Sequence, residues 1–227
     1  MVGRRLSWVL IEMYKAQEDF RMIGCDELAY ATRRVESIFY CHGFASHFDP
    51  QKQKIRFLAR LAPVCGVTVD YTDPPERVFN VFSRTLGACS HPLVVGTSMG
   101  GYFAAWLGGE FGCPFISINP VISPSKSLRK YIGDGRTHFG KHYTLTAEAV
   151  AAYADFPFRL DEKGLIVVDL EDEVIDAQMT ISVVKDRTQI IAFDGGSHRF
   201  DHMPTLVKLL CTRFHWSNQS PPRMSEE

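Results

Sequence analysis

The sequence has no hydrophobic run long enough to cross a membrane, no Cys-x-x-Cys pair and almost no net charge. A membrane-spanning helix needs about 18 consecutive apolar residues, and no small-residue cleavage site follows the short apolar stretch near the N-terminus. We therefore expect neither a membrane span nor a signal peptide. The 25 Lys and Arg residues against 26 Asp and Glu leave a formal net charge of −1. This balance provides no general attraction for nucleic acid or anionic lipid.

Three motifs of common cofactor sites are also missing. No Walker A loop, no Gly-x-Gly-x-x-Gly after the first predicted strand and no His-Glu-x-x-His occurs. His42, His47 and Asp49 are close in sequence but lack the further ligands that a metal hydrolase needs. We therefore predict no cofactor and no bound metal ion.

Cysteine is present, but not in a pattern typical of disulfides or metal sites. Most of the cysteines lie in or beside apolar runs, which is typical of buried, reduced thiols. They are Cys25, Cys41, Cys65, Cys89, Cys113 and Cys211. The cysteine usage therefore predicts a cytoplasmic protein.

The 227 residues, 45% of them hydrophobic, are enough for one large α/β domain. Short runs that are apolar throughout alternate with stretches of helical periodicity, and such runs predict parallel strands covered on both faces. The runs are residues 37–41, 67–71, 92–95, 115–118, 165–170 and 189–193, and the helical stretches are 53–61, 76–86, 102–107, 177–184 and 206–214. The order predicts a doubly wound, mostly parallel sheet of about six strands with helices on both faces.

The predicted organisation is a helical extension over residues 1–35, the α/β domain over 36–216 and a disordered tail over 217–227. One connection inside the domain, residues 121–163, is unusually long. It contains two helical stretches, 125–131 and 147–154, joined by the glycine-rich and aromatic segment 133–143. We expect this lid-like excursion to cross the carboxyl edge of the sheet, where open α/β sheets bind ligands.

The strongest local motif is Gly96-Thr97-Ser98-Met99-Gly100, which follows a predicted strand and opens a helix. In this setting a sharp turn exposes a nucleophilic serine, and the flanking glycines let the strand and the helix approach closely. The motif therefore indicates Ser98 as a nucleophile. The alternative is a structural serine in a glycine-rich turn.

A serine nucleophile needs a histidine base, which a carboxylate in turn orients. Among the 8 histidines, His198 lies directly after the last predicted strand, where the third member of a Ser, acid, His order belongs. The acid is expected just beyond the preceding strand, and Asp172 fits that position best. Asp176, which also fits a helix N-cap, and Glu173 remain as alternatives.

Acyl transfer also needs hydrogen-bond donors for the developing oxyanion. The segment His42-Gly43-Phe44 follows the first predicted strand, so a backbone N–H is expected near the serine turn. We predict the amides of Phe44 and Met99 as the two donors. A turn capped by the histidine is the alternative for this segment. In the long excursion, Phe139 and Tyr143 are candidate walls of the substrate pocket.

Five stretches of the chain together resemble the YqiA/YcfP-type small α/β-hydrolases, a bacterial esterase family. They are IFYCHGFASH, VVGTSMGGYFAAWL, INPVISP, EDEVIDAQ and FDGGSHRF, which follow the family's order across residues 37–211. The resemblance implies an α/β-hydrolase fold and a triad of Ser98, Asp172 and His198. It also implies esterase or thioesterase activity.

The sequence therefore predicts a serine hydrolase that cleaves small-molecule acyl esters or thioesters through an acyl-enzyme. A noncatalytic protein of the same fold that binds a ligand or a partner is the alternative, because a fold by itself does not determine a function. Reaction of Ser98 with a serine-directed phosphonate distinguishes the two.

Overall fold

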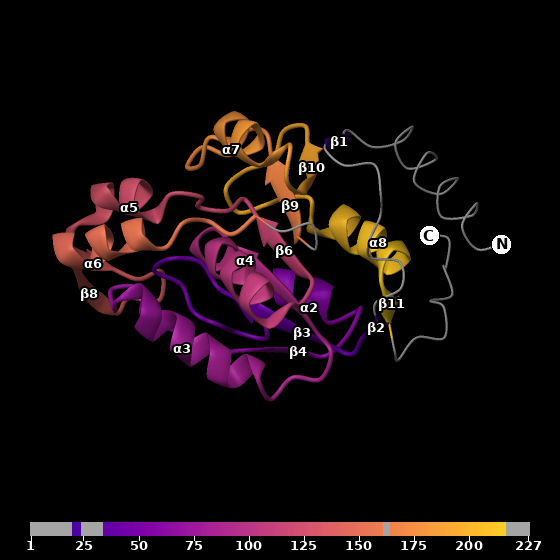
Figure 1. The fold of residues 1–227 in the computed structure, drawn as a ribbon, viewed down its shortest axis with the longest axis horizontal. Helices are drawn as coiled ribbons and strands as arrows, with labels where there is room; N and C mark the ends of the chain where they lie inside the picture. Colours follow the sequence, from indigo (N-terminus) through magenta and orange to yellow (C-terminus); the bar gives the residue numbers. More distant parts are fainter. Residues whose placement is uncertain (1–19, 24–33, 161–163, 217–227) are drawn as a thin grey trace, which may run out of the picture.

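The computed structural model describes residues 20–23, 34–160 and 164–216 of the chain. At its centre lies a seven-stranded sheet in the order β1-β10-β9-β6-β5-β3-β4 (Figure 1). Its strands are β1 (Phe20–Ile23), β3 (Ser37–Cys41), β4 (Val64–Gly66), β5 (Pro92–Thr97), β6 (Phe115–Ile118), β9 (Gly164–Asp169) and β10 (Gln189–Phe193). All neighbours pair in parallel except β1, which is antiparallel to β10. The predicted doubly wound, mostly parallel sheet is confirmed.

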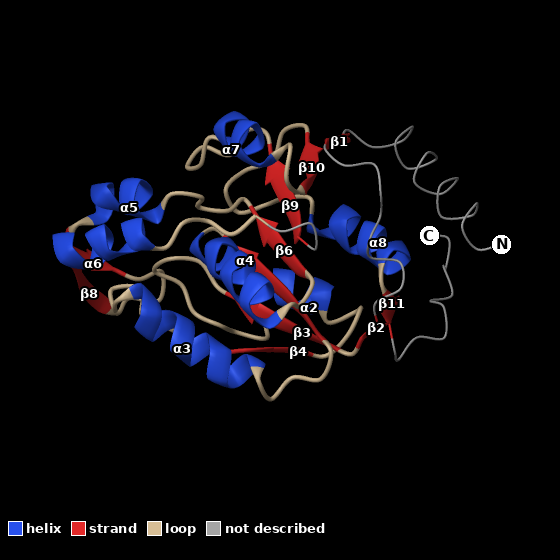
Figure 2. Ribbon diagram, in the orientation of Figure 1, coloured by secondary structure: helices blue, strands red, loops and turns tan. Residues whose placement is uncertain are grey.

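Helices cover both faces of this sheet (Figure 2). One face carries α3 (Pro75–Leu86), α4 (Met99–Phe111) and α7 (Ala177–Val184), and the other carries α2 (Gln53–Leu58) and α8 (Met203–Arg213). Along β3, Phe39 and Cys41 enter the first core, whereas Ile38 and Tyr40 enter the second. The strands are apolar throughout because alternate side chains are buried in two different cores.

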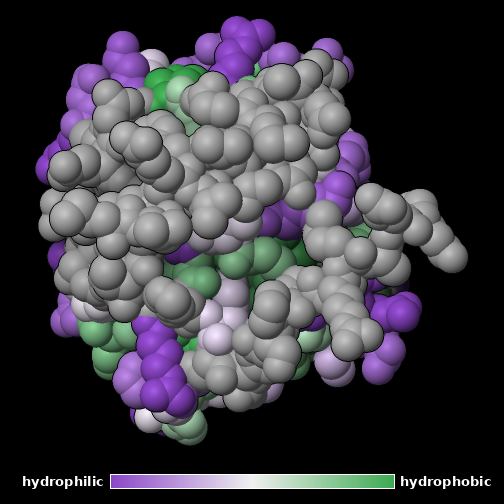
Figure 3. Space-filling model, turned by 90° about the vertical axis from the view of Figure 1, so that its right-hand side faces the viewer, coloured by the Kyte–Doolittle hydropathy of each residue, from purple (hydrophilic) through white to green (hydrophobic). Residues whose placement is uncertain are grey.

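In helix α8, most apolar residues lie on the face toward the core, and most polar residues lie on the face toward solvent. Its buried face includes Met203, Leu206 and Leu210, while Lys208 is exposed. On the side of the molecule where α8 lies, hydrophobic residues are visible near the middle and also at the upper and lower edges, and most hydrophilic residues lie toward the rim (Figure 3). No helix among the described residues combines the length and hydropathy that crossing a membrane requires.

The strand predicted at residues 67–71 is wrong, because β4 ends before that segment begins. Beyond β4 the amide of Val69 donates to the ring of His42 over 3.0 Å. The carboxylate of Asp70 accepts a hydrogen bond from the amide of Thr72, also over 3.0 Å. These local hydrogen bonds compete with a strand ladder and turn the chain away from the sheet edge.

The long connection between β6 and β9 is built from short elements. They are α5 (Pro124–Ser127), a 3₁₀ turn (Leu128–Tyr131), β7 (Gly133–Arg136), β8 (His142–Leu145), α6 (Ala147–Ala152) and a second 3₁₀ turn (Tyr153–Asp155). The segment 133–143 therefore contains an antiparallel hairpin pair. The amide of His138 donates to the carbonyl of Ala45 over 2.8 Å. This contact places the hairpin loop just beyond the carboxyl end of β3.

Most of residues 1–35 and all of 217–227 lie outside the described residues, so the disordered tail and most of the predicted helical extension stay predictions. The two described pieces of 1–35 are strands, β1 and β2 (Arg34–Val35), and a helix is wrong for them. β1 pairs with β10, and β2 pairs with β11 (His215–Trp216). The edge of β10 offers unpaired backbone groups, which a strand can satisfy and a helix cannot.

Two glycines let α4 pack directly on the sheet. A Cβ on Gly96 would lie 1.9 Å from the carbonyl oxygen of Gly100, and a Cβ on Gly100 would lie 2.0 Å from the carbonyl oxygen of Cys41. Both obstacles are backbone atoms, which cannot swing aside as a flexible side chain can. β5, α4 and β3 are therefore closer together than any larger residue permits.

We expect Gly100→Ala to lower the free energy of unfolding by about 1–3 kcal/mol, because the added methyl group would overlap the backbone of β3. Gly87→Ala is the matched control, since its Cβ would lie 3.5 Å from the nearest atom. Urea unfolding of both variants and the wild type measures the difference. Equal stability of all three proteins would contradict the packing described above.

Candidate active site

The site lies where the direction of strand addition reverses in the sheet. From β3 the chain continues to β4 on one side, and it then returns to β5 on the other side of β3. Open α/β sheets bind ligands at the carboxyl edge of such a switch point. Here the turn after β3 carries Gly43 and the turn after β5 carries Ser98. A Cβ on Gly43 would lie 3.4 Å from the Cβ of Ser98, so the two turns are in contact.

Ser98 has a backbone conformation that few residues other than glycine adopt, with φ of 57° and ψ of −121°. Hydrogen bonds hold it there: its amide donates to the carbonyl of Ile118 over 2.9 Å, and its carbonyl accepts from the amides of Gly101 and Val121. Strain of this kind persists only where the surrounding structure imposes it. The strand-to-helix turn predicted from the glycine motif is present.

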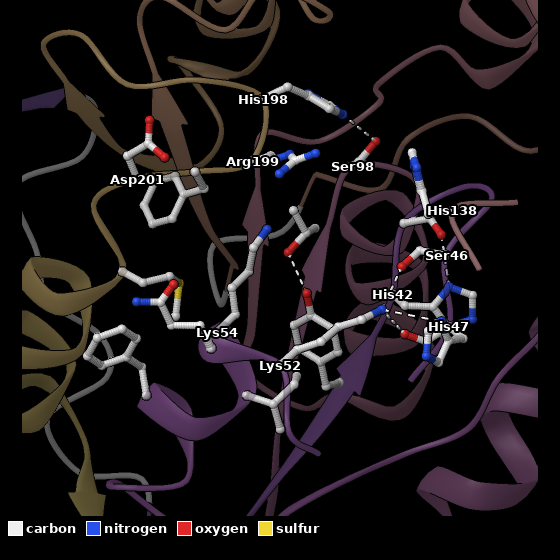
Figure 4. Close-up of a pocket in the computed structure, with 18 of the residues that line it drawn as sticks. His42, Ser46, His47, Lys52, Lys54, Ser98, His138, His198, Arg199 and Asp201 are labelled. Atoms are coloured by element: carbon white, nitrogen blue, oxygen red, sulfur yellow. Dashed lines mark hydrogen bonds between the residues drawn. The ribbon is translucent and has the colours of Figure 1, made fainter. Parts of the chain in front are cut away.

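A continuous chain of hydrogen bonds joins the three residues predicted as a triad. The Nε2 atom of His198 lies 3.1 Å from the Oγ of Ser98 (Figure 4), and its Nδ1 lies 2.8 and 3.0 Å from the carboxylate oxygens of Asp172. A carboxylate can only accept, so Nδ1 donates to Asp172. In the neutral imidazole Nε2 is then the acceptor, and the hydroxyl of Ser98 donates to it.

Of the three carboxylates considered for the acid, Asp172 is the one in contact with the imidazole. Its side chain is 1% exposed, and it also accepts from the amides of Val174 and Ile175. The carboxylate of Glu173 instead accepts from the backbone amide of His198, and this hydrogen bond lowers the pKa of Glu173. Asp176 caps α7 by accepting from the amide of Met179. The tertiary structure thus separates three neighbours that the sequence left as alternatives.

The loop that carries His198 is held by a buried carboxylate, a role that the sequence reasoning missed. Asp169 is fully buried at the end of β9 and accepts from the amides of Ser197 and Asp201. Its other oxygen lies 2.7 Å from the Nδ1 of His202. A carboxylate at the end of an otherwise apolar strand was the signal that could have revealed it.

Asn119, also missed, ties the same loop to the end of β6. Its side-chain amide donates to the carbonyl of Ser197 over 3.0 Å, and its side-chain oxygen accepts from the amide of Asp169 over 2.8 Å. The backbone of Asn119 has a positive φ of 42°, a conformation that asparagine tolerates better than most residues. β6, β9 and the loop after β10 are therefore joined directly behind His198.

The two amides predicted as oxyanion donors lie at the ends of the two turns. Met99 is the first residue of α4, where a backbone N–H has no partner within the helix. None of the hydrogen bonds found among the described residues uses the amide of Met99 or Phe44. Their role as oxyanion donors stays a prediction.

A cavity of about 750 Å³ opens beside Ser98 (Figure 4). Its walls come from the turn after β3, the start of α2, the loop that carries His198 and the hairpin loop, which contributes His138. Three cationic side chains, Lys52, Lys54 and Arg199, line it, and Asp201 is the one carboxylate among the described residues of its lining. The sequence analysis did not identify any of these four side chains.

Phe139 and Tyr143 do not line this cavity, and their role as walls of the substrate pocket stays a prediction. Both line a separate, smaller cavity of about 180 Å³. The ring of Tyr143 packs against that of Phe44 with centroids 5.3 Å apart, and the ring of Phe139 packs on His47 at 4.6 Å. The hairpin loop therefore packs against the turn after β3, and within the loop His138 also lines the cavity at Ser98.

The model of an uncharacterised protein family, UPF0227, matches residues 37–211. The chain belongs to the UPF0227 family. A UPF0227 protein of Shewanella sp. (strain MR-4) is 23% identical over 179 residues, which cover 74% of this chain and 96% of that protein. The resemblance stated from the sequence motifs is confirmed.

Solved structures similar to this UPF0227 chain share its fold. Est1E from Butyrivibrio proteoclasticus has a TM-score of 0.56 at 14% identity, covering 84% of this chain and 95% of that one. Alpha/beta hydrolase domain-containing protein 10 from mouse also has a TM-score of 0.56 at 14% identity, covering 85% and 90%. At such identities the likeness shows the fold alone, and that fold is the α/β-hydrolase fold.

His42 holds the turn after β3 in this UPF0227 protein. Its Nε2 accepts from the amide of Val69, so Nδ1 carries the proton and donates to the carbonyl of Gly43 over 2.8 Å. The hydroxyl of Tyr71 donates to the carbonyl of His42. Both ring nitrogens are thus engaged, which keeps His42 from joining His47 in a metal site. Burial lowers the pKa of His42 to about 4.

This low pKa predicts a loss of stability in mild acid. Above pH 6.5 His42 is neutral in both states, but between 6.5 and 4 only the unfolded chain takes up the proton. The unfolding free energy of the wild type should therefore fall by up to about 3 kcal/mol more than that of His42→Gln over this window. Urea unfolding at several pH values tests this, and parallel pH profiles would contradict it.

Proposed function

We propose that this UPF0227 protein is a serine hydrolase that cleaves carboxylic esters or thioesters through an acyl-enzyme. The observation that carries the proposal is the hydrogen-bond chain from Asp172 through His198 to Ser98, at a strained strand-to-helix turn. The α/β-hydrolase fold supports it only generally, because the same fold serves other functions.

In the first half of the reaction the Oγ of Ser98 attacks the acyl carbonyl, and Nε2 of His198 takes the hydroxyl proton. Asp172 keeps the imidazole in the required tautomer and stabilises the imidazolium that forms. His198 then gives the proton to the departing alcohol or thiol. The 3.1 Å separation of Nε2 and Oγ is within the range for direct proton transfer.

The negative charge that develops on the carbonyl oxygen needs donors in place before the reaction. The backbone amides of Phe44 and Met99 are the proposed donors, since they belong to the two turns that meet at Ser98. Removing one donor of this kind typically raises the barrier by about 3 kcal/mol. Because both donors are backbone groups, substitutions at these positions act only through the shape of the turn.

In the second half a water molecule attacks the acyl-enzyme, with His198 again acting as the base. Ser98 is then released with its proton, and the acid leaves through the cavity. Each proton in these steps moves between substrate, water, Ser98 and His198. The proposed reaction therefore requires no cofactor.

We expect Ser98→Ala to lower kcat for p-nitrophenyl butyrate by about 10⁴-fold or more, because the nucleophile is removed. The variant should also lose labelling by a fluorophosphonate. Ser182→Ala, which changes an exposed serine of α7, is the matched control. An acyl series from acetate to palmitate, measured alongside, gives the preferred acyl length.

Two outcomes would contradict the proposal. Unchanged hydrolysis and labelling in Ser98→Ala would show that another residue is the nucleophile. A wild type that hydrolyses no ester and takes no label would favour the noncatalytic binding protein.

A further inference from the structure

Two cationic side chains in the cavity beside Ser98 have no role in the reaction proposed above. Lys54 is the second residue of α2, and Arg199 directly follows His198. Both line the cavity that contains Ser98. The amine end of Lys54 extends toward Arg199 and the part of the cavity that holds Ser98 (Figure 4). These two charges therefore face the space that a substrate would occupy.

The neighbouring Lys52 lines the same cavity, but its ammonium group has hydrogen-bond partners. Its ammonium donates to the Oγ of Ser46 over 3.0 Å and to the carbonyl of His47 over 2.8 Å. In contrast, the side chains of Lys54 and Arg199 make no hydrogen bond or ion pair with any described residue. Their donors are available to a ligand.

The environment of Lys54 makes an unpaired ammonium unfavourable there. Burial lowers the pKa of Lys54 to about 8, and the positive charges of Lys52 and Arg199 act in the same direction. The carboxylates of Asp169 and Asp201 offset part of this effect. Asp169 is already bound by two amides and His202, so it does not serve as a direct partner. A bound anion would supply the missing partner.

We propose that Lys54 and Arg199 bind an anionic group of the ester, a carboxylate or a phosphate, so that the preferred substrate is an acidic ester. A guanidinium can hold such a group through two parallel hydrogen bonds, while an ammonium adds a point charge. The lining of three cationic side chains against one carboxylate favours an anion in the cavity over a neutral or cationic group. This proposal deepens the proposed hydrolase function and rests on it.

The test compares esters of similar size and shape, one charged and one neutral. On the acyl side the pair is p-nitrophenyl hydrogen adipate and p-nitrophenyl 6-methylheptanoate, in which an isopropyl group replaces the carboxylate. On the alcohol side the pair is 4-carboxyphenyl butyrate and 4-isopropylphenyl butyrate. We expect the wild type to favour the charged ester of at least one pair. Inhibition by inorganic phosphate, compared with inhibition by acetate, distinguishes the two anion chemistries.

We expect Lys54→Gln and Arg199→Gln each to lower the charged-to-neutral ratio of kcat/KM about tenfold, because each removes one charged donor. Lys185→Gln, an exposed lysine at the end of α7, is the matched control and should leave the ratio unchanged. Melting temperatures check folding, and Arg199→Gln, at an exposed residue, keeps the test valid if Lys54→Gln is unstable.

The proposal is overturned if the wild type hydrolyses the neutral esters but shows no preference for the charged one in either pair. It is also overturned if both variants keep the wild-type ratio. Neither result would contradict the proposed hydrolase function. Failure of the hydrolase function itself is a different result, in which no ester is cleaved and no fluorophosphonate label is taken up.

The same subsite predicts a pH dependence. Lys52, Arg199, Asp169 and Asp201 are the charged groups around Lys54, and together with burial they place its pKa at about 8. The charged-to-neutral ratio should therefore fall as the pH rises from 7 to 9, because Lys54 loses its proton. Both esters use the same triad, so effects of pH on the chemical step itself cancel in the ratio. Lys54→Arg should flatten the profile, and an unchanged slope in that variant would contradict the assignment.

Discussion

The close approach of β5, α4 and β3 is the constraint on which the rest of the site depends. Gly96 and Gly100 allow it, since a Cβ on either would overlap backbone atoms. The chain must then reverse within a single residue, and that residue is Ser98, with its positive φ. The same approach brings the turn after β3 against the serine. One packing requirement therefore sets both the exposed hydroxyl and the position of the neighbouring backbone amides.

The site also requires that the imidazole of His198 is held in position, and two aspartates contribute to this in different ways. Asp172 contacts the imidazole of His198, whereas Asp169 and Asn119 hold the loop that carries it. The carboxylate of Asp169 is fully buried, but its accepting capacity is used by two amides and a histidine. A buried carboxylate is tolerated when it is hydrogen-bonded in this way. The imidazole can then remain aligned while its charge changes during the proposed reaction.

The two sides of the cavity differ in charge. On one side, burial keeps His42 neutral, and its two ring nitrogens are used to shape the turn after β3. On the other side, Lys54 and Arg199 bring positive charge close to Ser98. The excursion between β6 and β9 packs mainly against Phe44 and His47, and its His138 also lines the cavity. Both charged side chains of the proposed subsite therefore come from α2 and the loop that carries His198, while the excursion contributes His138 to the lining.

The sequence by itself determined the features that local residue patterns encode. Apolar runs indicated the parallel sheet, glycine spacing indicated the turn at Ser98, and chain order indicated His198 after the last strand. Only the tertiary structure decided which carboxylate meets that histidine and which side chains line the cavity. The sequence favoured Asp172 but left Glu173 and Asp176 as alternatives, and the fold of the loop gives each of the three a different contact. Lys54 lies far from Ser98 along the chain, and helix packing across the sheet brings the two together. Contacts of this kind depend on how elements that are distant in the sequence pack together, which local sequence patterns do not predict.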